Sequence, residues 1–266
     1  MNIDELNRQI KACRKCRLAE TRLNVLCGEG SLQGRIMLIA QAPGETEDRE
    51  GRMFVGPSGK VLDDLLSAAR VDRSSLYITN LVKCILPKYR KPKQDEIEAC
   101  SEWLDREIQL VNPDVLVPLG YYAARHVFKK YALPFSSKKE FGLVAGRMVL
   151  TEEIKILPLS HPAVVLHQPH LKESLTGNYA VLNTLLKECR WFPVCPMKRY
   201  TEQGLLDRSW TQMFCRGDWK SCIRYQMDAK GEPHTDWMLP DGSISNSLKN
   251  GLVHQASYVP HGYDAV

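Results

Sequence analysis

The sequence has no long hydrophobic run: no apolar stretch approaches the ~18 residues that a membrane-spanning helix needs. Residues 1–5 also lack the basic-then-apolar pattern of a secretory signal. These two absences predict a cytoplasmic protein without a membrane partner. The hydrophobic content of 44% and the charged content of 25% are ordinary for a globular chain, so a sizeable core is available.

The C-terminal part of the chain lacks any excess of charge. Residues 191–266 carry eight basic and eight acidic side chains, so the net charge of +5 lies within residues 1–190. Five basic residues of that part fall close together: Lys83, Lys88, Arg90, Lys91 and Lys93. Such a cluster can neutralise phosphates of a nucleic acid, and a solvated basic loop is the alternative.

The sequence also lacks the even number of cysteines that a complete set of disulfides requires. It has nine cysteines. In an intracellular protein this favours metal or cluster ligation. Cys13 and Cys16 form a Cys-x-x-Cys pair, Cys84 ends a predicted strand and Cys100 lies in a predicted helix. Four thiolates in this arrangement can hold either a tetrahedral zinc ion or a 4Fe–4S cluster.

The order of the predicted elements is typical of an α/β protein. Apolar runs predict four strands, at residues 35–40, 76–83, 111–120 and 155–159. Periodic segments predict helices at residues 3–12, from about Ser58, and at 94–109, 121–128 and 172–189. A hairpin is expected across residues 143–150.

The first predicted strand ends in a loop that we interpret as the active-site loop. The chain breaks at Pro43-Gly44 after Gln41, continues through an acidic run that contains Glu47, and reaches Phe54. In an open α/β sheet, ligands bind beyond the carboxyl ends of the strands. A connection that only turns the chain is the alternative for the Pro-Gly pair.

Three side chains near predicted strand ends are candidates for recognition or catalysis. Phe54, in a polar loop, can stack on a planar base or fill a gap in the core. Asn80 lies in an apolar strand, where its amide must be satisfied by backbone groups or by the edge of a pyrimidine. His161 follows the fourth strand and precedes a proline, which restricts it to extended geometry; a loop histidine without a catalytic role is the alternative.

The composition changes after residue 190. Four of the five tryptophans lie in residues 191–266. Four cysteines near or within this tail form a candidate second metal site: Cys189, Cys195, Cys215 and Cys222. A metal would help so short a segment to fold, and packing of the tail's tryptophans and cysteines on the main domain is the alternative. We therefore expect a domain at 1–190 and a small irregular module at 191–266.

From Cys13 to about Glu188 the chain resembles the family 4 uracil-DNA glycosylases, the iron–sulfur branch of those enzymes. The resemblance rests on the quartet Cys13, Cys16, Cys84 and Cys100 and on the motifs 42–44, 47–48, 54–56, 79–84, 90–92 and 161–163, with Leu166 and Pro169. It implies a three-layer α/β/α fold around a central, mainly parallel four-stranded sheet. It also implies that the quartet ligates a structural 4Fe–4S cluster.

The same resemblance implies a base-excision reaction on single- or double-stranded DNA that contains uracil. Deoxyuridine would be flipped out of the DNA, with Phe54 stacked on the base and Asn80 paired with its N3–H and O4. His161 would stabilise negative charge on uracil O2, and Gln41 and Ala42 would position the attacking water. No lysine lies in the loop, so hydrolysis without a lyase step is expected.

The sequence departs from the family pattern in the same loop. Ala40-Gln41 stands where Gly-Glu is common, and an amide can orient water but cannot act as a base. Gly44 has no side chain to exclude the methyl group of thymine, a task that Glu47 could take. Residues 87–92 are short and lack the histidine of a branch that crosslinks to the abasic product, which disfavours that chemistry.

Other functions remain open from the sequence. One is a non-catalytic iron–sulfur protein that binds nucleic acid or senses redox state, and another is a glycosylase for a different deaminated base. The tail could hold a second cluster or a zinc ion, or could bind a repair or replication protein.

Overall fold

The structure is a computed structural model that describes residues 2–135, 137–151 and 154–251. The chain divides into two compact units, the first ending at Leu186 and the second beginning at Lys187. The division lies close to the boundary expected at residue 190. Within the described ranges, no helix is long and apolar enough to cross a membrane.

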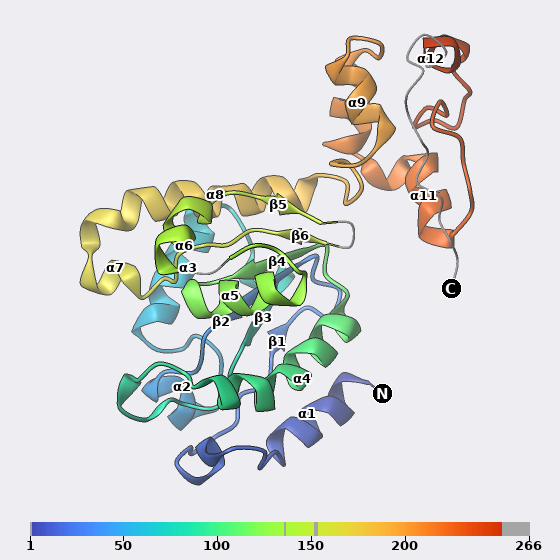
Figure 1. The fold of residues 1–266 in the computed structure, drawn as a ribbon. Helices are drawn as coiled ribbons and strands as arrows, with labels where there is room; N and C mark the ends of the chain where they lie inside the picture. The colour runs from blue at the N-terminus through green and yellow to red at the C-terminus, as the bar shows by residue number, and fades with distance from the viewer. Residues whose placement is uncertain (1, 136, 152–153, 252–266) are drawn as a thin grey trace. The chain divides into compact units, whose positions relative to one another are not determined.

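The first unit is built on one six-stranded sheet, with strand order β1-β3-β2-β4-β6-β5 (Figure 1). The strands are β1 (Glu29–Gly30), β2 (Ile36–Ala40), β3 (Tyr77–Asn80), β4 (Val115–Pro118), β5 (Val149–Leu150) and β6 (Lys155–Ile156). The inner four, β3, β2, β4 and β6, pair in parallel. They confirm the expected parallel strands, while β1 and β5 add antiparallel edges that the sequence did not predict.

Helices cover both faces of this sheet, which gives the expected three layers. The longer helices are α1 (Ile3–Lys11), α3 (Pro57–Ala68), α4 (Gln94–Val111), α5 (Tyr121–Lys130) and α8 (Lys172–Lys187). The shorter ones are α2 (Glu45–Glu50), α6 (Lys138–Val144) and α7 (Val164–His167).

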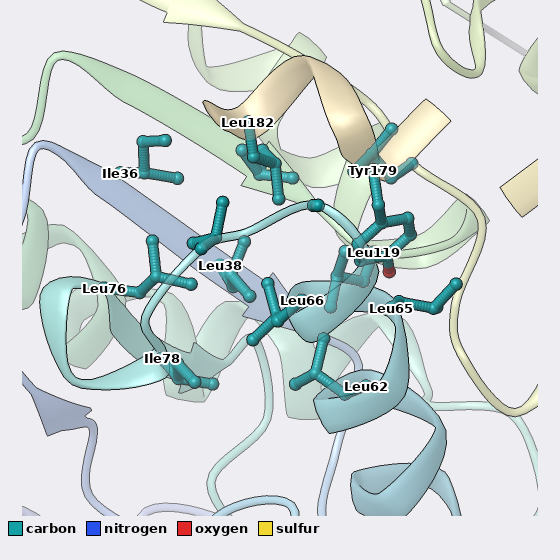
Figure 2. Close-up of a cluster of buried hydrophobic side chains, with 14 of the residues drawn as sticks. Ile36, Leu38, Leu62, Leu65, Leu66, Leu76, Ile78, Leu119, Tyr179 and Leu182 are labelled. Atoms are coloured by element: carbon teal, nitrogen blue, oxygen red, sulfur yellow. The ribbon is translucent and has the colours of Figure 1, made fainter. Parts of the chain in front are cut away.

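The strands are buried on both faces, as an inner parallel sheet requires. In β2, Ile36 and Leu38 pack into one core with side chains of α3 and α8 (Figure 2). Met37 and Ile39 point to the opposite face and pack with side chains of α4 and α5. This alternation explains why the sequence of β2 is continuously apolar.

The hairpin expected across residues 143–150 is wrong. Residues 138–144 form α6, whose first turn is capped by the Ser137 side chain, which accepts from the Glu140 amide at 3.2 Å. The chain then turns at Gly146, where φ is +80°. The antiparallel pair lies further on, between β5 and β6.

Strand register brings the ends of the parallel strands to one edge of the sheet. Ala40 at the end of β2 pairs with Asn80 at the end of β3. Leu119, just after β4, bridges to Leu159, just after β6. Segments that follow β2, β3, β4 and β6 therefore leave the sheet at its carboxyl edge, where crevices form in such folds.

The second unit has little regular structure. Its helices are α9 (Pro196–Glu202), α10 (Arg208–Trp210), α11 (Ile223–Lys230) and α12 (Asn246–Gly251), with a π-helical turn at Thr211–Cys215. Its small core contains seven buried apolar residues: Cys189, Phe192, Met197, Tyr200, Leu206, Cys215 and Leu248.

Candidate active site and cysteine-lined cavities

His161 follows β6 and is held in one tautomer by its own loop. The Ala163 amide donates a hydrogen bond to Nδ1 of the ring at 3.1 Å. Burial lowers the pKa of His161 from 6.5 to about 4. The imidazole is therefore neutral at physiological pH, and because Nδ1 accepts, the proton lies on Nε2. Nε2–H is left as a hydrogen-bond donor.

The backbone around His161 is fixed from two sides. The buried Tyr179 of α8 donates its hydroxyl proton to the carbonyl of Ser160 at 3.1 Å. Gly120, with φ of +86°, lies against His161, and a Cβ built there would stand 3.5 Å from the Cβ of His161. Glycine is favoured at this position because of its positive φ, since a Cβ would be accommodated at an ordinary contact distance.

Phe54 lies beside His161 in a left-handed backbone conformation. Its φ is +52°, and its ring stacks on that of His161 with centroids 5.8 Å apart and an interplanar angle of 25°. The Arg73 guanidinium donates to the carbonyl oxygens of Met53 at 2.6 Å and Phe54 at 3.2 Å. A Cβ at Gly59 would stand 1.9 Å from the Phe54 carbonyl oxygen, so only glycine fits there.

The sequence left open whether Phe54 fills the core or offers a stacking surface for a base, and its position suits both. It is 6% exposed and belongs to the core around α3. A base inserted between two rings needs about 7 Å, twice the carbon–carbon contact distance. The observed 5.8 Å is shorter. In this arrangement a planar base can lie against one ring but not between the two.

Asn80 ends β3 and is 2% exposed. Its side-chain nitrogen donates to the sulfur of Met53 at 3.2 Å. A thioether is a weak acceptor. In the described part of the chain this is the only hydrogen bond of the Asn80 side chain, so its carbonyl oxygen and a second N–H are available to a ligand.

The acidic residues of the loop hold the backbone together. Glu47 is buried and accepts from the Gly56 amide at 2.8 Å, and a Cβ at Gly44 would stand 2.6 Å from its carboxylate. The neighbouring Asp48 accepts from the amides of Leu23 and Asn24 at 3.0 and 3.1 Å. The absence of a side chain at Gly44 therefore leaves room for Glu47.

Gln41 and Ala42 stand directly after β2 and are partly buried. The Gln41 carbonyl oxygen accepts from the Val82 amide at 3.0 Å, which joins the segments that follow β2 and β3. Gln41 is thereby placed at the carboxyl edge of the sheet, near the end of the strand that carries Asn80.

The basic cluster is smaller than the sequence suggested. Lys83 is 1% exposed and forms an ion pair with Glu107, which is also buried, so it cannot reach a phosphate. Arg90 pairs with Glu96. The exposed members are Lys88, Lys91 and Lys93. Sequence spacing could not reveal the buried carboxylates that neutralise the other two.

The first cysteine quartet lines one cavity. Its members come from the ends of α1 and β3 and from α4: Cys13, Cys16, Cys84 and Cys100. Three of the sulfurs accept hydrogen bonds. The donors are the Trp103 indole to Cys13 at 3.3 Å, Arg22 to Cys84 at 3.1 Å and the Lys83 amide to Cys100 at 3.2 Å.

This donor set fits thiolates better than thiols, because N–H groups and a guanidinium stabilise negative charge on sulfur. Burial nevertheless raises the pKa of Cys100 to about 12 in the absence of a cation. A bound metal centre would supply the positive charge that such buried thiolates require.

The second quartet also lines a single cavity, within the second unit. Its members are Cys189, Cys195, Cys215 and Cys222. The structure therefore brings together all eight cysteines expected to act as ligands, in two groups of four. The ninth, Cys27, lines neither cavity.

Several residues that support the site were missed in the sequence. Arg73 and Tyr179 act on backbone carbonyl oxygens, and Met53 contacts Asn80 through a thioether. None of them belongs to a motif. A polar Tyr179 within the apolar face of α8 was the one available signal, since a buried hydroxyl needs a partner.

Comparison with known proteins gives a family for this architecture. A family model, the uracil DNA glycosylase superfamily, matches residues 27–182. A type-4 uracil-DNA glycosylase of Sulfurisphaera tokodaii is 36% identical over 79% of this chain and 94% of its own. One from Archaeoglobus fulgidus is 34% identical over 69% of this chain and 93% of its own.

A type-5 uracil-DNA glycosylase is similar over a shorter region. The protein from Pyrobaculum aerophilum is 32% identical, over 50% of this chain and 63% of its own. The type-4 relatives thus match a larger share of this chain.

Proposed function

Because the chain belongs to the uracil DNA glycosylase superfamily, we propose that it removes uracil from DNA by hydrolysing the N-glycosidic bond. The observation that carries this is the neutral His161, whose Nε2–H is left free to donate beside the Phe54 ring. Asn80 stands at the same edge of the sheet with an amide that still has donor and acceptor capacity.

Recognition would begin with extrusion of the nucleotide, which costs a few kcal/mol of stacking and pairing. The base would lie against the Phe54 ring. The Asn80 carbonyl oxygen would accept from N3–H of uracil, and its N–H would donate to O4. Cytosine presents an acceptor at N3 and a donor at C4, so both contacts would be lost, leaving buried polar groups unpaired.

Bond cleavage develops positive charge on the sugar and negative charge on the departing uracil. The Nε2–H of His161 would donate to O2 of the base as this charge forms. A preorganised donor of this kind contributes about 3 kcal/mol to catalysis. A neutral imidazole is suited to this role because it donates without having to give up its proton.

Water attack on the sugar would be guided by the segment after β2. The amide of Gln41 can orient a water molecule through its carbonyl oxygen, but it cannot accept the proton as a base. The oxocarbenium-like sugar is a strong electrophile, so positioning of water can suffice. Gln41→Glu would supply a base and should preserve or raise the rate of cleavage.

Residues of the first quartet would hold a 4Fe–4S cluster. The donor set fits, since three N–H groups already point at the sulfurs. When bound, the cluster would supply a crosslink between α1, the segment after β3 and α4. It would stabilise the region that precedes the exposed lysines, Lys88 and Lys91, which we propose contact DNA phosphates.

A cleavage assay tests the proposed function. Anaerobically purified full-length protein is incubated with oligonucleotides that carry U, T or C at one position, and the products are treated with alkali. We expect strand cleavage at U alone, and no borohydride-trapped enzyme–DNA adduct. Binding of all three DNAs without cleavage would instead favour a non-catalytic nucleic-acid-binding protein.

A further inference from the structure

We propose that the C-terminal unit holds a second 4Fe–4S cluster on four cysteines: Cys189, Cys195, Cys215 and Cys222. The family match ends at residue 182, so it assigns no role to these residues. The inference is independent of the glycosylase reaction, which is placed in the first unit.

The four cysteines line a single cavity, as the first quartet does. The Cys189 amide donates to the Cys215 carbonyl oxygen at 2.6 Å, which brings the first and third cysteines together. Four cysteine thiolates are the usual ligand set of a 4Fe–4S cluster.

A residue that lines this cavity also has a buried hydrogen-bond donor without a partner among the described residues. Arg224 lines the cavity and is 3% exposed. One of its terminal nitrogens donates to the carbonyl oxygens of Thr235 at 2.7 Å and Met238 at 2.8 Å, but its Nε has no partner among the described residues.

A buried guanidinium stays charged, and its charge needs a nearby anion. Four thiolates give an iron–sulfur cluster a net negative charge, which would satisfy Arg224. Arg22 occupies the equivalent place in the first quartet, where it lines the cavity and donates to the Cys84 sulfur at 3.1 Å. Each quartet is thus accompanied by one arginine.

Cys222 occupies the N-cap position of α11. Amide groups at a helix start favour negative charge on a nearby sulfur, so this position suits a thiolate ligand.

The second unit also needs a crosslink to be stable. Within residues 187–251, its core has seven buried apolar residues, two of which are cysteines, and the longest helix, α11, has eight residues. Units with so small a core usually depend on a metal centre or on disulfides. A cluster that joins residues 189, 195, 215 and 222 would connect most of the unit.

Iron and sulfide analysis of the full-length protein tests the proposal. Anaerobically purified protein should contain about eight irons and eight sulfides per chain, four from each cubane. The paired substitution Cys215→Ser with Cys222→Ser should halve the iron content and the absorption near 400 nm. Cys84→Ser should remove the other half, and the control Cys27→Ser should leave both values unchanged.

Three results would overturn the proposal. About four irons in the wild-type protein, with full uracil cleavage, would leave the second quartet without a cluster while preserving the proposed function. One zinc per chain in addition to four irons would assign a different metal. Loss of free thiols at the four tail cysteines in protein purified without reductant would assign disulfides. None of these measurements depends on whether a variant folds.

Discussion

Arg73 should set the position of the Phe54 ring without touching the base. Its guanidinium donates to the carbonyl oxygens of Met53 and Phe54 and to the Asp63 carboxylate. Phe54 stands at φ of +52°, a conformation that costs a residue with a Cβ about 1–2 kcal/mol. The hydrogen bonds of Arg73 offset this cost.

The size of the effect follows from those contacts. A hydrogen bond from a charged donor contributes about 1.5–3 kcal/mol when buried. The Arg73 side chain is 31% exposed, so water would replace part of the loss, leaving about 2 kcal/mol for the pair of carbonyl contacts. This is comparable to the backbone strain, and Arg73→Ala should therefore allow the Phe54 segment to relax.

Relaxation would remove the stacking surface for the base. Stacking on an aromatic ring is worth about 1–3 kcal/mol, so we expect uracil-DNA to bind or react at least about fivefold more weakly. Single-turnover cleavage of a single-U oligonucleotide, over a range of enzyme concentrations, measures both quantities. Arg73→Lys should recover part of the loss, because an ammonium can reach one carbonyl but cannot bridge two.

Arg70→Ala is the matched control, since Arg70 is exposed and also has a positive φ of 55°. It should cleave like the wild-type protein. If Arg73→Ala folds and also keeps the wild-type rate and affinity, then the guanidinium does not hold Phe54 in place and the argument from backbone strain is wrong.

Four further predictions concern recognition, catalysis and DNA binding. His161→Ala should lower the single-turnover rate at least a hundredfold with little change in DNA affinity; an equal loss of both would remove His161 from the chemical step. With its pKa lowered to about 4, His161 stays neutral as the pH falls from 8 to 5, so the cleavage rate should decline only as the pH approaches 4, and a decline centred near 6.5 would contradict this. Asn80→Asp offers only acceptors when ionised, so uracil cleavage should fall steeply, whereas unchanged selection of U over C would show that Asn80 does not read the base. Lys88→Ala with Lys91→Ala should make the salt dependence of DNA binding shallower by about two in slope, and an unchanged slope would place the DNA elsewhere.

The inner sheet was predictable because its strands lie within longer apolar runs of the sequence, at residues 35–40, 76–83, 111–120 and 155–159. β2 and β4 are buried along their whole length, and the sequence signals them clearly. The edge strands β1 and β5 have two residues each, too few to show a pattern. Their existence depends on pairing with neighbours rather than on local preference.

Clustering of the cysteines could be anticipated from residue type and spacing, since few other roles suit so many thiols. The residues that support the active site could not be anticipated from the sequence. Arg73 and Tyr179 hold backbone groups, which leave no trace in a motif. For Lys83 the sequence suggested a role that the structure excludes. This lysine looked available to DNA, but it is neutralised by Glu107, which lies 24 residues further along the chain.

Mass spectrometry of the products from a single-U oligonucleotide tests the central claim most directly. The full-length protein is incubated with the oligonucleotide, and the released base and the DNA product are analysed. The account predicts free uracil in a one-to-one ratio with an uncleaved strand that carries an abasic site. An intact oligonucleotide in the presence of folded, cluster-containing protein, or a DNA product cleaved by elimination, would contradict it.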